Sequence, residues 1–430
     1  MRVALITLGC PKNTVDSEMI KGALESESVV FTDETEQAEI IIVNTCGFIQ
    51  SAKEEAIETI LQAAQFKESG ECSKVFVTGC LVTRYRDELI SSIPEVDGFI
   101  ENRNIPKVIQ QLGKQAGLPV CQHPKRSLLT PTHYAYLKIA EGCNNRCSYC
   151  AIPMIRGSFR SFPLNSIEQE AERLVRCGIK ELILIAQDTT LYGDDLHPKT
   201  NLATLLNRLS DGQLPPWIRL MYTHPAHYSD ELIDVVASRP EICKYLDLPL
   251  QHISDPILKA MGRKVTRKEI EQLIQKLRDR IPGLAIRTSF IVGFPGESDS
   301  AFSELLEFVA EMQFDRLGAF TYSPEEGTPA YEMPGQVPDK LKNERLEQLL
   351  TAQAEISLQQ NMALINSEFD VLIDEYESDS GFFVGRTSLD APEIDNSVLI
   401  RDSSCKIGKF NRIKIIDAFE FDLIGQLISN

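Results

Sequence analysis

The sequence has no apolar run that approaches the roughly eighteen residues of a membrane span, and its N-terminus, MRVALITLGC, lacks a basic region followed by a long apolar one. We therefore expect neither a membrane helix nor a secretory signal, and we expect a cytoplasmic location. Basic residues are outnumbered, with 44 Lys plus Arg against 62 Asp plus Glu and a formal net charge of -18. Because nucleic acid binding depends on Lys and Arg that neutralise phosphates, such a chain either gathers its basic residues locally or binds another kind of partner, for example a basic protein.

Cysteine, by contrast, is plentiful, and three of the eleven cysteines stand close together in EGCNNRCSYCAIPMIRG. Cys143, Cys147 and Cys150 have a C-x3-C-x2-C spacing, and cysteine thiolates at short fixed spacings hold iron-sulfur clusters. A four-iron cluster with three protein ligands keeps one iron open for another molecule. A structural zinc site usually has four ligands, often two C-x2-C pairs, and no second pair follows here. A disulfide fits poorly with a reducing compartment, so the spacing favours a cluster, with zinc binding and simple packing as the alternatives.

Residues 1 to 112 alternate between strand-like and helix-like patterns. Short β-branched runs predict strands at Val3–Leu8, Glu39–Asn44 and Lys74–Thr78. Between them, Val15–Glu25 and Ser51–Phe66 have helical patterns, and we predict that Ser51 caps a helix with an acidic first turn. This alternation is typical of an open parallel α/β sheet.

Each of these predicted strands runs into a cysteine, namely Cys10, Cys46 and Cys80. Because ligands of open α/β sheets collect at the carboxyl ends of strands, the three thiols can converge on one point as a second three-thiolate site. The alternative for each is a small buried apolar residue at the end of a core strand. The other cysteines lack such a pattern, and we expect no metal at Cys121-x-His123. They are predicted to be packing residues: Cys72, Cys121, Cys177, Cys243 and Cys405.

A second alternating series follows a connection rich in glycine, proline and polar residues at Gly113–His133. Six strands with helices between them indicate a partial β/α barrel that does not close. The C-x3-C-x2-C loop follows the first of these strands, at the face where such barrels place their chemistry. The predicted strands are Ala135–Ile139, Glu181–Ala186, Ile218–Tyr222, Tyr245–Leu248, Ala285–Ile291 and Arg316–Phe320, and the predicted helices include Ser166–Arg176, Asp230–Ala237, Arg267–Arg280 and Asp299–Glu311.

Polar residues and glycines just past these strands are candidates to contact a bound cofactor. They are Gln187 and Asp188, Gln251 and His252, and the GFPGE turn at Gly293–Glu297, each with a capping or turn role as the alternative. His224 and His227 are expected to be loop or packing residues. Arg156 and Arg160 follow the three-cysteine segment, and each either meets a carboxylate there or forms a surface salt bridge.

The C-terminal part begins after a proline-rich and glycine-rich exit at Ser323–Pro338. We predict a polar helix over Asp339–Met362, laid against the barrel by a stripe of Leu341, Leu346, Leu349 and Leu350. From Ala363 onward, short alternating strands predict a small antiparallel barrel. This part has thirteen Asp plus Glu against six Lys plus Arg, which repels a phosphate backbone and favours a basic protein partner. The expected domains are therefore 1–115, 130–362 and 363–430.

The C-x3-C-x-aromatic-C pattern, with Tyr149 before the last cysteine, resembles the signature of the radical S-adenosylmethionine (SAM) enzymes, which have such a partial barrel. The resemblance implies that the three cysteines bind a 4Fe-4S cluster whose open iron chelates SAM. It also implies that Tyr149, Gln187, Gln251 and Gly293 lie near SAM. Reductive cleavage of SAM then gives a radical that abstracts hydrogen from an unactivated carbon.

LGCPKNTVDSE, VNTCGF and VTGC, in this order, are similar to the N-terminal domain of the methylthiotransferases, and the terminal barrel resembles their TRAM domain. The resemblance implies an auxiliary 4Fe-4S cluster on Cys10, Cys46 and Cys80, from which sulfur is inserted, and a low-potential electron donor. GRTSLDAPEIDN (Gly385–Asn396) resembles the RimO type, which modifies the β-carbon of an aspartate in the twelfth small-subunit ribosomal protein. The alternatives are a transfer RNA methylthiotransferase that acts on a modified adenosine, and a non-catalytic iron-sulfur or RNA-binding protein.

Overall fold

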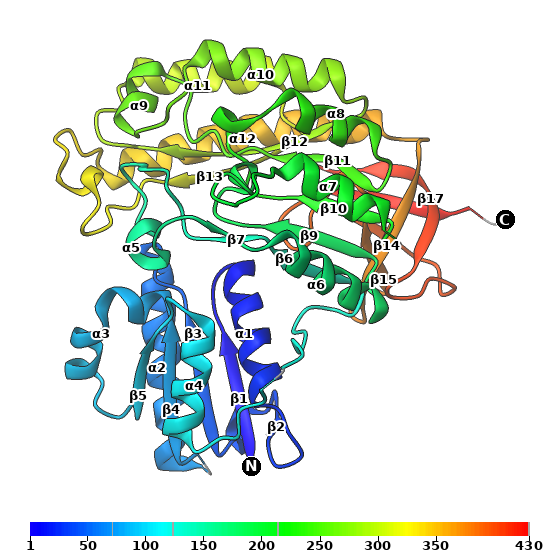
Figure 1. The fold of residues 1–430 in the computed structure, drawn as a ribbon. Coiled ribbons are helices and arrows are strands. Elements are labelled where there is room, and N and C mark those ends of the chain that lie inside the picture. Colours follow the sequence, from blue (N-terminus) through cyan, green and yellow to red (C-terminus); the bar gives the residue numbers. More distant parts are fainter. Residues whose placement is uncertain (71, 123, 213–214, 429–430) are drawn as a thin grey trace. The chain divides into compact units, whose positions relative to one another are not determined.

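The computed structural model describes residues 1–430 except 71, 123, 213–214 and 429–430 (Figure 1). The chain forms two compact units. The first comprises Met1–Thr130, Glu141–Arg160 and Ser323–Tyr331, and the second comprises Pro131–Ala140, Ser161–Tyr322 and Glu332–Asn430. The C-x3-C-x2-C segment therefore belongs to the same unit as the three strand-end cysteines. Each helix in the described part of the chain is too short or too polar to cross a membrane.

A five-stranded parallel sheet forms the centre of the first unit, which confirms the predicted α/β sheet. Its strand order is β2-β1-β3-β4-β5. The sequence patterns did not predict β2 and β5, which are shorter than the other three strands. The strands are β1 (Arg2–Thr7), β2 (Val30–Phe31), β3 (Ile40–Thr45), β4 (Lys74–Gly79) and β5 (Gly98–Glu101).

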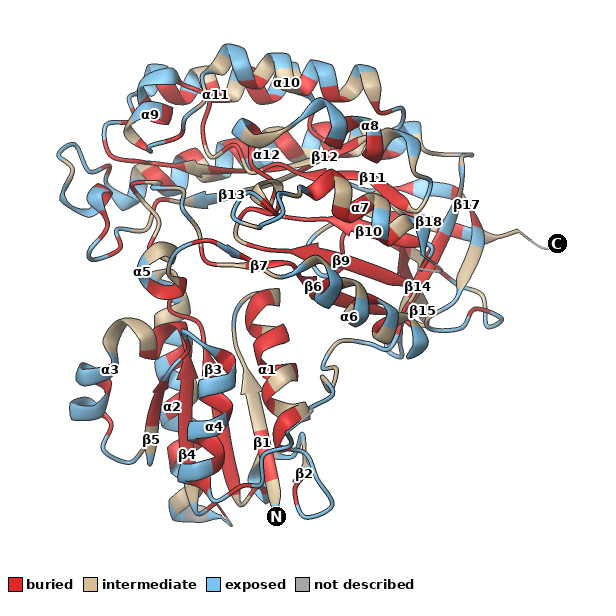
Figure 2. Cartoon of the chain, viewed as in Figure 1, coloured by how far each residue is buried: buried red, intermediate tan, exposed pale blue. Residues whose placement is uncertain are grey.

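Helices cover both faces of this sheet (Figures 1 and 2). The helices α1 (Pro11–Leu24) and α4 (Ile105–Ala116) pack on one face, and α2 (Gln50–Ser69) and α3 (Cys80–Ser92) pack on the other. Every residue of β3 is buried, because this strand is covered on both sides.

The predicted start of α2 is wrong. Ile49 is the N-cap position, Ser51 lies inside the helix, and the first turn lacks an acidic residue. The backbone N–H of Gln50 donates instead to the hydroxyl of Ser323, at 3.4 Å. A partner so far along the chain has no local sequence signal.

A six-stranded parallel sheet forms the centre of the second unit. Its strands follow the chain order from β6 at one edge to β13 at the other, which confirms the predicted open, partial barrel. The strands are β6 (Tyr134–Lys138), β9 (Glu181–Ile185), β10 (Trp217–Leu220), β11 (Ile242–Asp247), β12 (Ala285–Val292) and β13 (Arg316–Thr321). The connecting helices are α6 (Leu164–Arg176), α7 (Leu202–Asp211), α8 (Asp230–Ser238), α9 (Asp255–Ala260), α10 (Arg267–Arg280) and α11 (Asp299–Met312).

The long helix α12 (Asp339–Ala363) packs against β12 and β13, as expected, but through a polar face. The predicted stripe of leucines is wrong, since Leu349 is buried whereas Leu350 is 40% exposed. Lys342 and Arg345 lie on the buried face, where Arg345 Nη1 is 2.8 Å from Glu297 Oε1. Long basic side chains bury their apolar stems while their charged ends reach a partner, so a buried helix face need not be apolar.

The C-terminal part forms a closed five-stranded barrel with its own apolar core, which confirms the predicted small barrel. The prediction that it is antiparallel throughout is wrong, since its fourth and third strands along the barrel, Asp422–Leu427 and Ser397–Ile400, pair in parallel. The strands in barrel order are β14 (Glu368–Glu377), β15 (Phe382–Arg386), β16 (Ser397–Ile400), β18 (Asp422–Leu427) and β17 (Phe410–Ala418).

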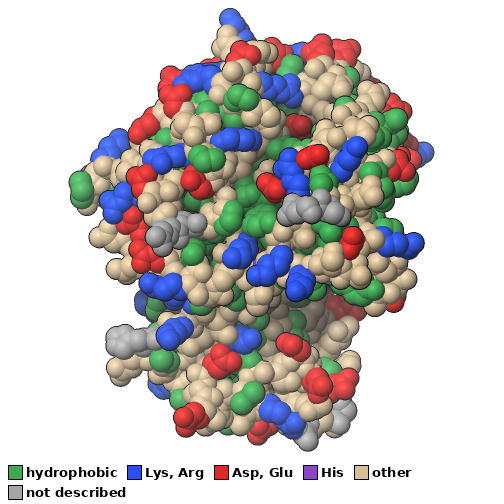
Figure 3. Space-filling model, turned by 90° about the vertical axis from the view of Figure 1, so that its right-hand side faces the viewer, with side chains coloured by type: hydrophobic (Ala, Val, Ile, Leu, Met, Phe, Trp, Pro, Cys, Tyr) green, Lys and Arg blue, Asp and Glu red, His purple; other side chains and the backbone are tan. Residues whose placement is uncertain are grey.

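The segment Gly385–Asn396 joins this small barrel to the six-stranded sheet of the same unit. Asp390 Oδ1 lies 2.6 Å from Arg316 Nη2, and Asp395 Oδ1 lies 3.4 Å from Arg287 Nε. Both acidic side chains are about as buried as core residues, at 2% and 1% exposure. Burial of these two carboxylates leaves fewer acidic groups of this domain at the surface than its composition indicates. Figure 3 shows one face of the whole chain, on which acidic and basic side chains are interspersed.

Candidate functional site

The three strand-end cysteines lie where the order of the first sheet reverses. In the order β2-β1-β3-β4-β5, the chain turns back between β1 and β3, and the crevice outside the carboxyl ends of such strands is where open α/β sheets bind ligands. Cys10 is the N-cap of α1 after β1, Cys46 follows β3, and Cys80 is the first residue of α3 after β4.

The thiols of these cysteines lie within electrostatic reach of one another. Burial raises the pKa of Cys80 to about 12, and the charges of Cys10 and Cys46 contribute to the rise. Burial also raises the pKa of Cys46, with a further contribution from Cys10. The three cysteines thus lie at the carboxyl ends of neighbouring strands, and their convergence on one ligand stays a prediction. The raised pKa values of Cys46 and Cys80 favour the protonated thiols in the absence of a metal.

Glycines beside the cysteines make this convergence possible. Gly9 has a φ of +92°, and a Cβ on it would lie 2.7 Å from the Cβ of Cys46. Gly47, after Cys46, approaches the next loop so closely that a Cβ would lie 2.6 Å from the Cα of Leu81. Only residues without a side chain allow the three loops to come this near one another.

Arg156 adds a buried positive charge to the same place. It ends the short helix α5 (Ile152–Arg156), which follows the C-x3-C-x2-C segment. Its Nη1 lies 2.6 Å from Asp16 Oδ2, and its Nη2 donates to Asn13 Oδ1. Of the two arginines for which a carboxylate or a surface salt bridge was expected, Arg156 has the buried carboxylate, whereas Arg160 is exposed. The sequence patterns did not indicate Asn13 and Asp16. The signal that could have found them is that both are polar residues in the helix that directly follows Cys10.

The C-x3-C-x2-C segment is an irregular loop held by backbone hydrogen bonds. The N–H of Cys143 donates to the carbonyl of Gly157 at 3.1 Å, and the N–H of Ala330 donates to the carbonyl of Ser148 at 2.8 Å. Cys143, Cys147 and Cys150 are all partly exposed. They therefore differ from Cys46 and Cys80, which are buried.

The predicted cofactor contacts in the second unit follow the carboxyl ends of its strands. Gln187 follows β9, Gln251 follows β11 and Gly293 follows β12. Gln251 has a φ of +74°, a strained conformation for a residue with a side chain, and such strain gathers at binding sites. Packing alone requires a glycine at position 293, because a Cβ there would lie 2.3 Å from Cγ of Lys342. Its N–H donates to Glu297 Oε2 at 2.9 Å.

Asp188, His224 and His227 form a cluster that the sequence analysis treated as separate residues. His227 Nδ1 lies 2.9 Å from Asp188 Oδ2, and the two imidazole rings stack with their centres 4.6 Å apart. The polar atoms of the three side chains lie within 4.8 Å of one another. However, His224 Nδ1 accepts the N–H of Ala226 at 3.2 Å, so its other nitrogen carries the proton of the neutral ring. This hydrogen bond argues against a metal ion at the cluster.

Two predictions for the remaining cysteines are wrong. Cys72, Cys243 and Cys405 are buried packing residues, as expected, but Cys121 and Cys177 are exposed. His123, the other member of the C-x-H pair, lies outside the described residues.

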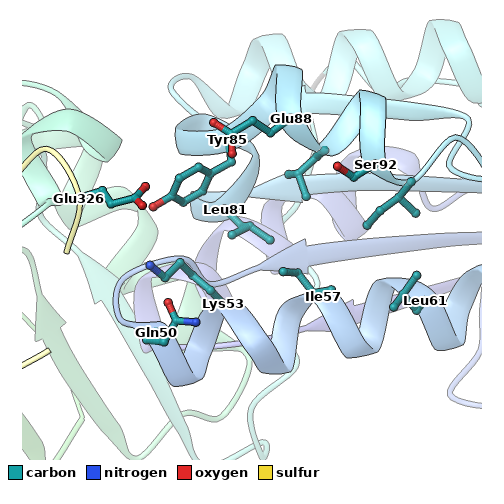
Figure 4. A pocket seen from close by; sticks show the side chains of 11 residues that line it. Gln50, Lys53, Ile57, Leu61, Leu81, Tyr85, Glu88, Ser92 and Glu326 are labelled. Carbon is teal, nitrogen blue, oxygen red and sulfur yellow. The ribbon is translucent and has the colours of Figure 1, made fainter. Parts of the chain in front are cut away.

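A surface groove of about 490 Å³ runs between α2 and α3 of the first unit (Figure 4). Lys53, Tyr85 and Glu326 gather at one end of it, whereas Ile57 and Leu61 line it along α2. Leu81, directly after Cys80, also borders the groove, but the three thiols do not belong to its lining.

Comparisons with known proteins cover the whole chain. Residues 137–309 match the radical SAM superfamily, residues 2–101 match the uncharacterized protein family UPF0004, and residues 365–428 match the TRAM domain. The chain is 49% identical over 439 residues to "Ribosomal protein uS12 methylthiotransferase RimO" of Desulforamulus reducens, with 99% of each chain covered. It is 46% identical over 441 residues to the protein of that name in Geobacter sulfurreducens, with 100% of this chain and 99% of the relative covered. The chain belongs to the RimO family of methylthiotransferases.

Solved structures agree with the RimO family assignment at the level of the fold. The radical SAM methyltransferase TsrM from Kitasatospora setae superposes with a TM-score of 0.57 over 76% of each chain, at 15% identity. The cobalamin-dependent SAM radical enzyme OxsB superposes with a TM-score of 0.52 over 83% of this chain and 56% of that chain, at 14% identity. These likenesses show a shared fold and carry no information on substrate.

Membership of the radical SAM superfamily implies a 4Fe-4S cluster and SAM. The donor set of the C-x3-C-x2-C segment fits such a cluster, since three thiolates on one short loop leave a fourth iron open. The strand-end cysteines are compatible with a second three-thiolate group, because they follow the carboxyl ends of three neighbouring strands where the strand order reverses.

Proposed function

We propose that this protein methylthiolates the β-carbon of an aspartate in ribosomal protein uS12, using SAM both as the methyl source and as the radical source. The observation that carries the proposal is full-length identity of 44% to 49% with relatives named as uS12 methylthiotransferases. The presence of two three-cysteine sets in one compact unit supports it, since sulfur insertion requires a radical generator and a sulfur donor.

In this proposal the six cysteines have two roles. Cys143, Cys147 and Cys150 hold a 4Fe-4S cluster, which supplies the electron that cleaves SAM when both are bound. Cys10, Cys46 and Cys80 hold an auxiliary 4Fe-4S cluster from which sulfur is inserted. Neither cysteine set can replace the other. The cluster on the C-x3-C-x2-C segment generates the radical, whereas the cluster on the strand-end cysteines supplies the sulfur.

Residues of the partial barrel orient SAM. Tyr149 precedes the last cluster cysteine, and Gln187, Gln251 and Gly293 follow the carboxyl ends of three barrel strands, the end at which such barrels bind their ligands. The positive φ of Gln251 fixes the direction in which its side chain leaves the backbone.

The proposed division into domains is 1–115 for the auxiliary cluster, 130–362 for the radical SAM barrel with its following helix, and 363–430 for the TRAM-like barrel. The acidic terminal domain attracts the basic ribosomal protein, and a low-potential donor reduces the clusters. A ribosomal substrate puts the reaction in the cytoplasm.

Product analysis tests the proposal. Anaerobically reconstituted protein, a reductant and SAM are incubated with either small ribosomal subunits or transfer RNA, and the products are weighed by mass spectrometry. We expect uS12 to gain one methylthio group in place of one hydrogen. Modification of the RNA instead would overturn the substrate, and failure to release 5'-deoxyadenosine would overturn the enzyme class.

A further inference from the structure

Arg156 shares a hydrogen-bond partner with the strand-end thiol of Cys80, although it belongs to the segment that carries the other three cysteines. Its guanidinium is 2% exposed and is paired with Asp16, which is fully buried. Burying such a charge is costly unless it is paired and hydrogen-bonded, and the pair contributes little to stability compared with apolar packing. The placement therefore calls for a reason beyond stability.

Asn13 fixes the guanidinium relative to the loops that carry two of the thiols. Its side-chain Oδ1 accepts a hydrogen bond from Arg156 Nη2. Its Nδ2 donates to the carbonyls of Leu8, at 2.9 Å, and Thr45, at 3.1 Å. Leu8 lies two residues before Cys10, and Thr45 lies directly before Cys46. The guanidinium therefore has a defined position relative to the loops that carry these two cysteines.

The charge of Arg156 acts on these sulfurs. Asn13 Oδ1, which accepts the hydrogen bond from Arg156 Nη2, also lies 3.7 Å from Cys80 Sγ, so the guanidinium lies close to this sulfur. The guanidinium therefore stabilises negative charge at the thiols. Charges in a dry interior interact strongly, so the same field acts on any anionic group bound there.

We propose that Arg156 is a tuning residue, whose guanidinium raises the reduction potential of the cluster on Cys10, Cys46 and Cys80. The inference rests on the proposed function, because it assumes an auxiliary cluster on these cysteines. Reduction adds negative charge to a cluster, and a nearby cation stabilises the reduced form. Asp16 has the opposite effect, since its carboxylate partly cancels the cation.

The test measures the reduction potential of the auxiliary cluster alone. In the full-length chain, Cys143, Cys147 and Cys150 are all changed to Ala. The strand-end cysteines are then the set left to hold a cluster. The protein is reconstituted with iron and sulfide, and its potential is titrated with detection by electron paramagnetic resonance. Iron content and circular dichroism are recorded for every variant, and neither SAM nor substrate is needed.

Three substitutions should give three different results in this background. Arg156→Met should shift the potential downward, and Arg156→Lys, which keeps the charge but not the paired geometry, should shift it less. Asp16→Asn should shift the potential upward. Arg160→Met is the matched control, because Arg160 is an exposed arginine of the same segment, and it should leave the potential unchanged.

Equal potentials in the parent, Arg156→Met and Asp16→Asn would overturn the inference, as would shifts of the same sign. If Arg156→Met fails to retain iron, Asp16→Asn decides, since an upward shift supports the inference and no shift overturns it. If the parent background itself binds no cluster, the auxiliary cluster of the proposed function fails too, which separates that failure from a failure of tuning alone.

Discussion

At the scale of single residues, the two cysteine sets are expected to serve different steps of the reaction. Cys147→Ala should abolish cleavage of SAM, whereas Cys46→Ala should keep cleavage and lose transfer of the methylthio group. The reason is that we propose Cys147 as a ligand of the radical-generating cluster and Cys46 as a ligand of the auxiliary cluster. Release of 5'-deoxyadenosine and the mass of uS12 measure the two steps separately. Normal product formation by Cys46→Ala would show that the second set has no role in the reaction.

Gly9 is predicted to be essential for the assembly of the strand-end site. Gly9→Ala forces a side chain into a backbone with a φ of +92° and leaves its Cβ 2.7 Å from the Cβ of Cys46, so we expect the iron bound by the strand-end set to be lost. Gly117→Ala is the matched control, because Gly117 has a φ of +73° but a Cβ there meets nothing within 4 Å. Equal iron content in the two variants would contradict the prediction.

His224 should make the second unit less stable in acid. Burial lowers its pKa to about 3, with a smaller contribution from the charge of Arg263. An unfolded histidine takes up a proton near pH 6.5, so the unfolded state binds more protons as the pH falls from about 6.5 toward 3. Stability is therefore lost over that window, by at most about 1.4 kcal/mol per pH unit for one group.

The His224 prediction can be measured with the single tryptophan, Trp217, which lies in the second unit. Urea midpoints from its fluorescence should fall between pH 7 and pH 5, and His224→Gln should reduce that fall. His197→Gln, at an exposed position, should leave the fall unchanged. The prediction fails if both variants show the same dependence on pH, since His224 would then contribute nothing to it.

At the scale of elements, the segment Gly385–Asn396 is predicted to hold the terminal barrel on the second unit. Asp390→Ala leaves the buried guanidinium of Arg316 without its carboxylate, which should cost about 3 kcal/mol or more. Trp217 stacks edge-on against Phe410 of the terminal barrel, with ring centres 4.8 Å apart, so its fluorescence reports on this junction. Unfolding in urea should begin at a lower concentration in Asp390→Ala.

Asp379→Ala is the control for this prediction, because it removes an exposed acid of the same barrel. Equal urea midpoints for Asp379→Ala and Asp390→Ala would contradict the structural role of the segment and would leave its acidic residues available to a partner.

Elements with a strong local pattern were predictable from sequence. The helix α10 begins at Arg267 and ends at Arg280, as predicted, because Thr266 and Glu269 form a capping box at its start. The buried face of α12 was not predictable, since Lys342 and Arg345 are buried by partners on distant parts of the chain. The start of α10 was predictable because its stabilising partner is local in sequence. The buried face of α12 was not, because its partners are distant.

At the scale of the whole molecule, the same distinction decides how much of the site could be predicted. The placement of Cys10, Cys46 and Cys80 at one edge of the sheet follows from parallel topology, because the carboxyl ends of neighbouring parallel strands share one edge. The pairing of Arg156 with Asp16 joins residues 140 positions apart, and no periodicity or spacing relates them. The prediction of two cysteine sets therefore needed only residue spacing and topology, whereas the fold was needed to find the buried charge of Arg156.

The division of the cysteines into two cluster sites is tested most directly by counting iron. Reconstituted wild-type protein should bind about eight irons per chain, as two four-iron clusters. Changing Cys10, Cys46 and Cys80 to Ala together should leave about four, and changing Cys143, Cys147 and Cys150 to Ala together should also leave about four. A full complement of iron in either triple variant, or loss of all iron in both, would contradict two independent three-thiolate sites.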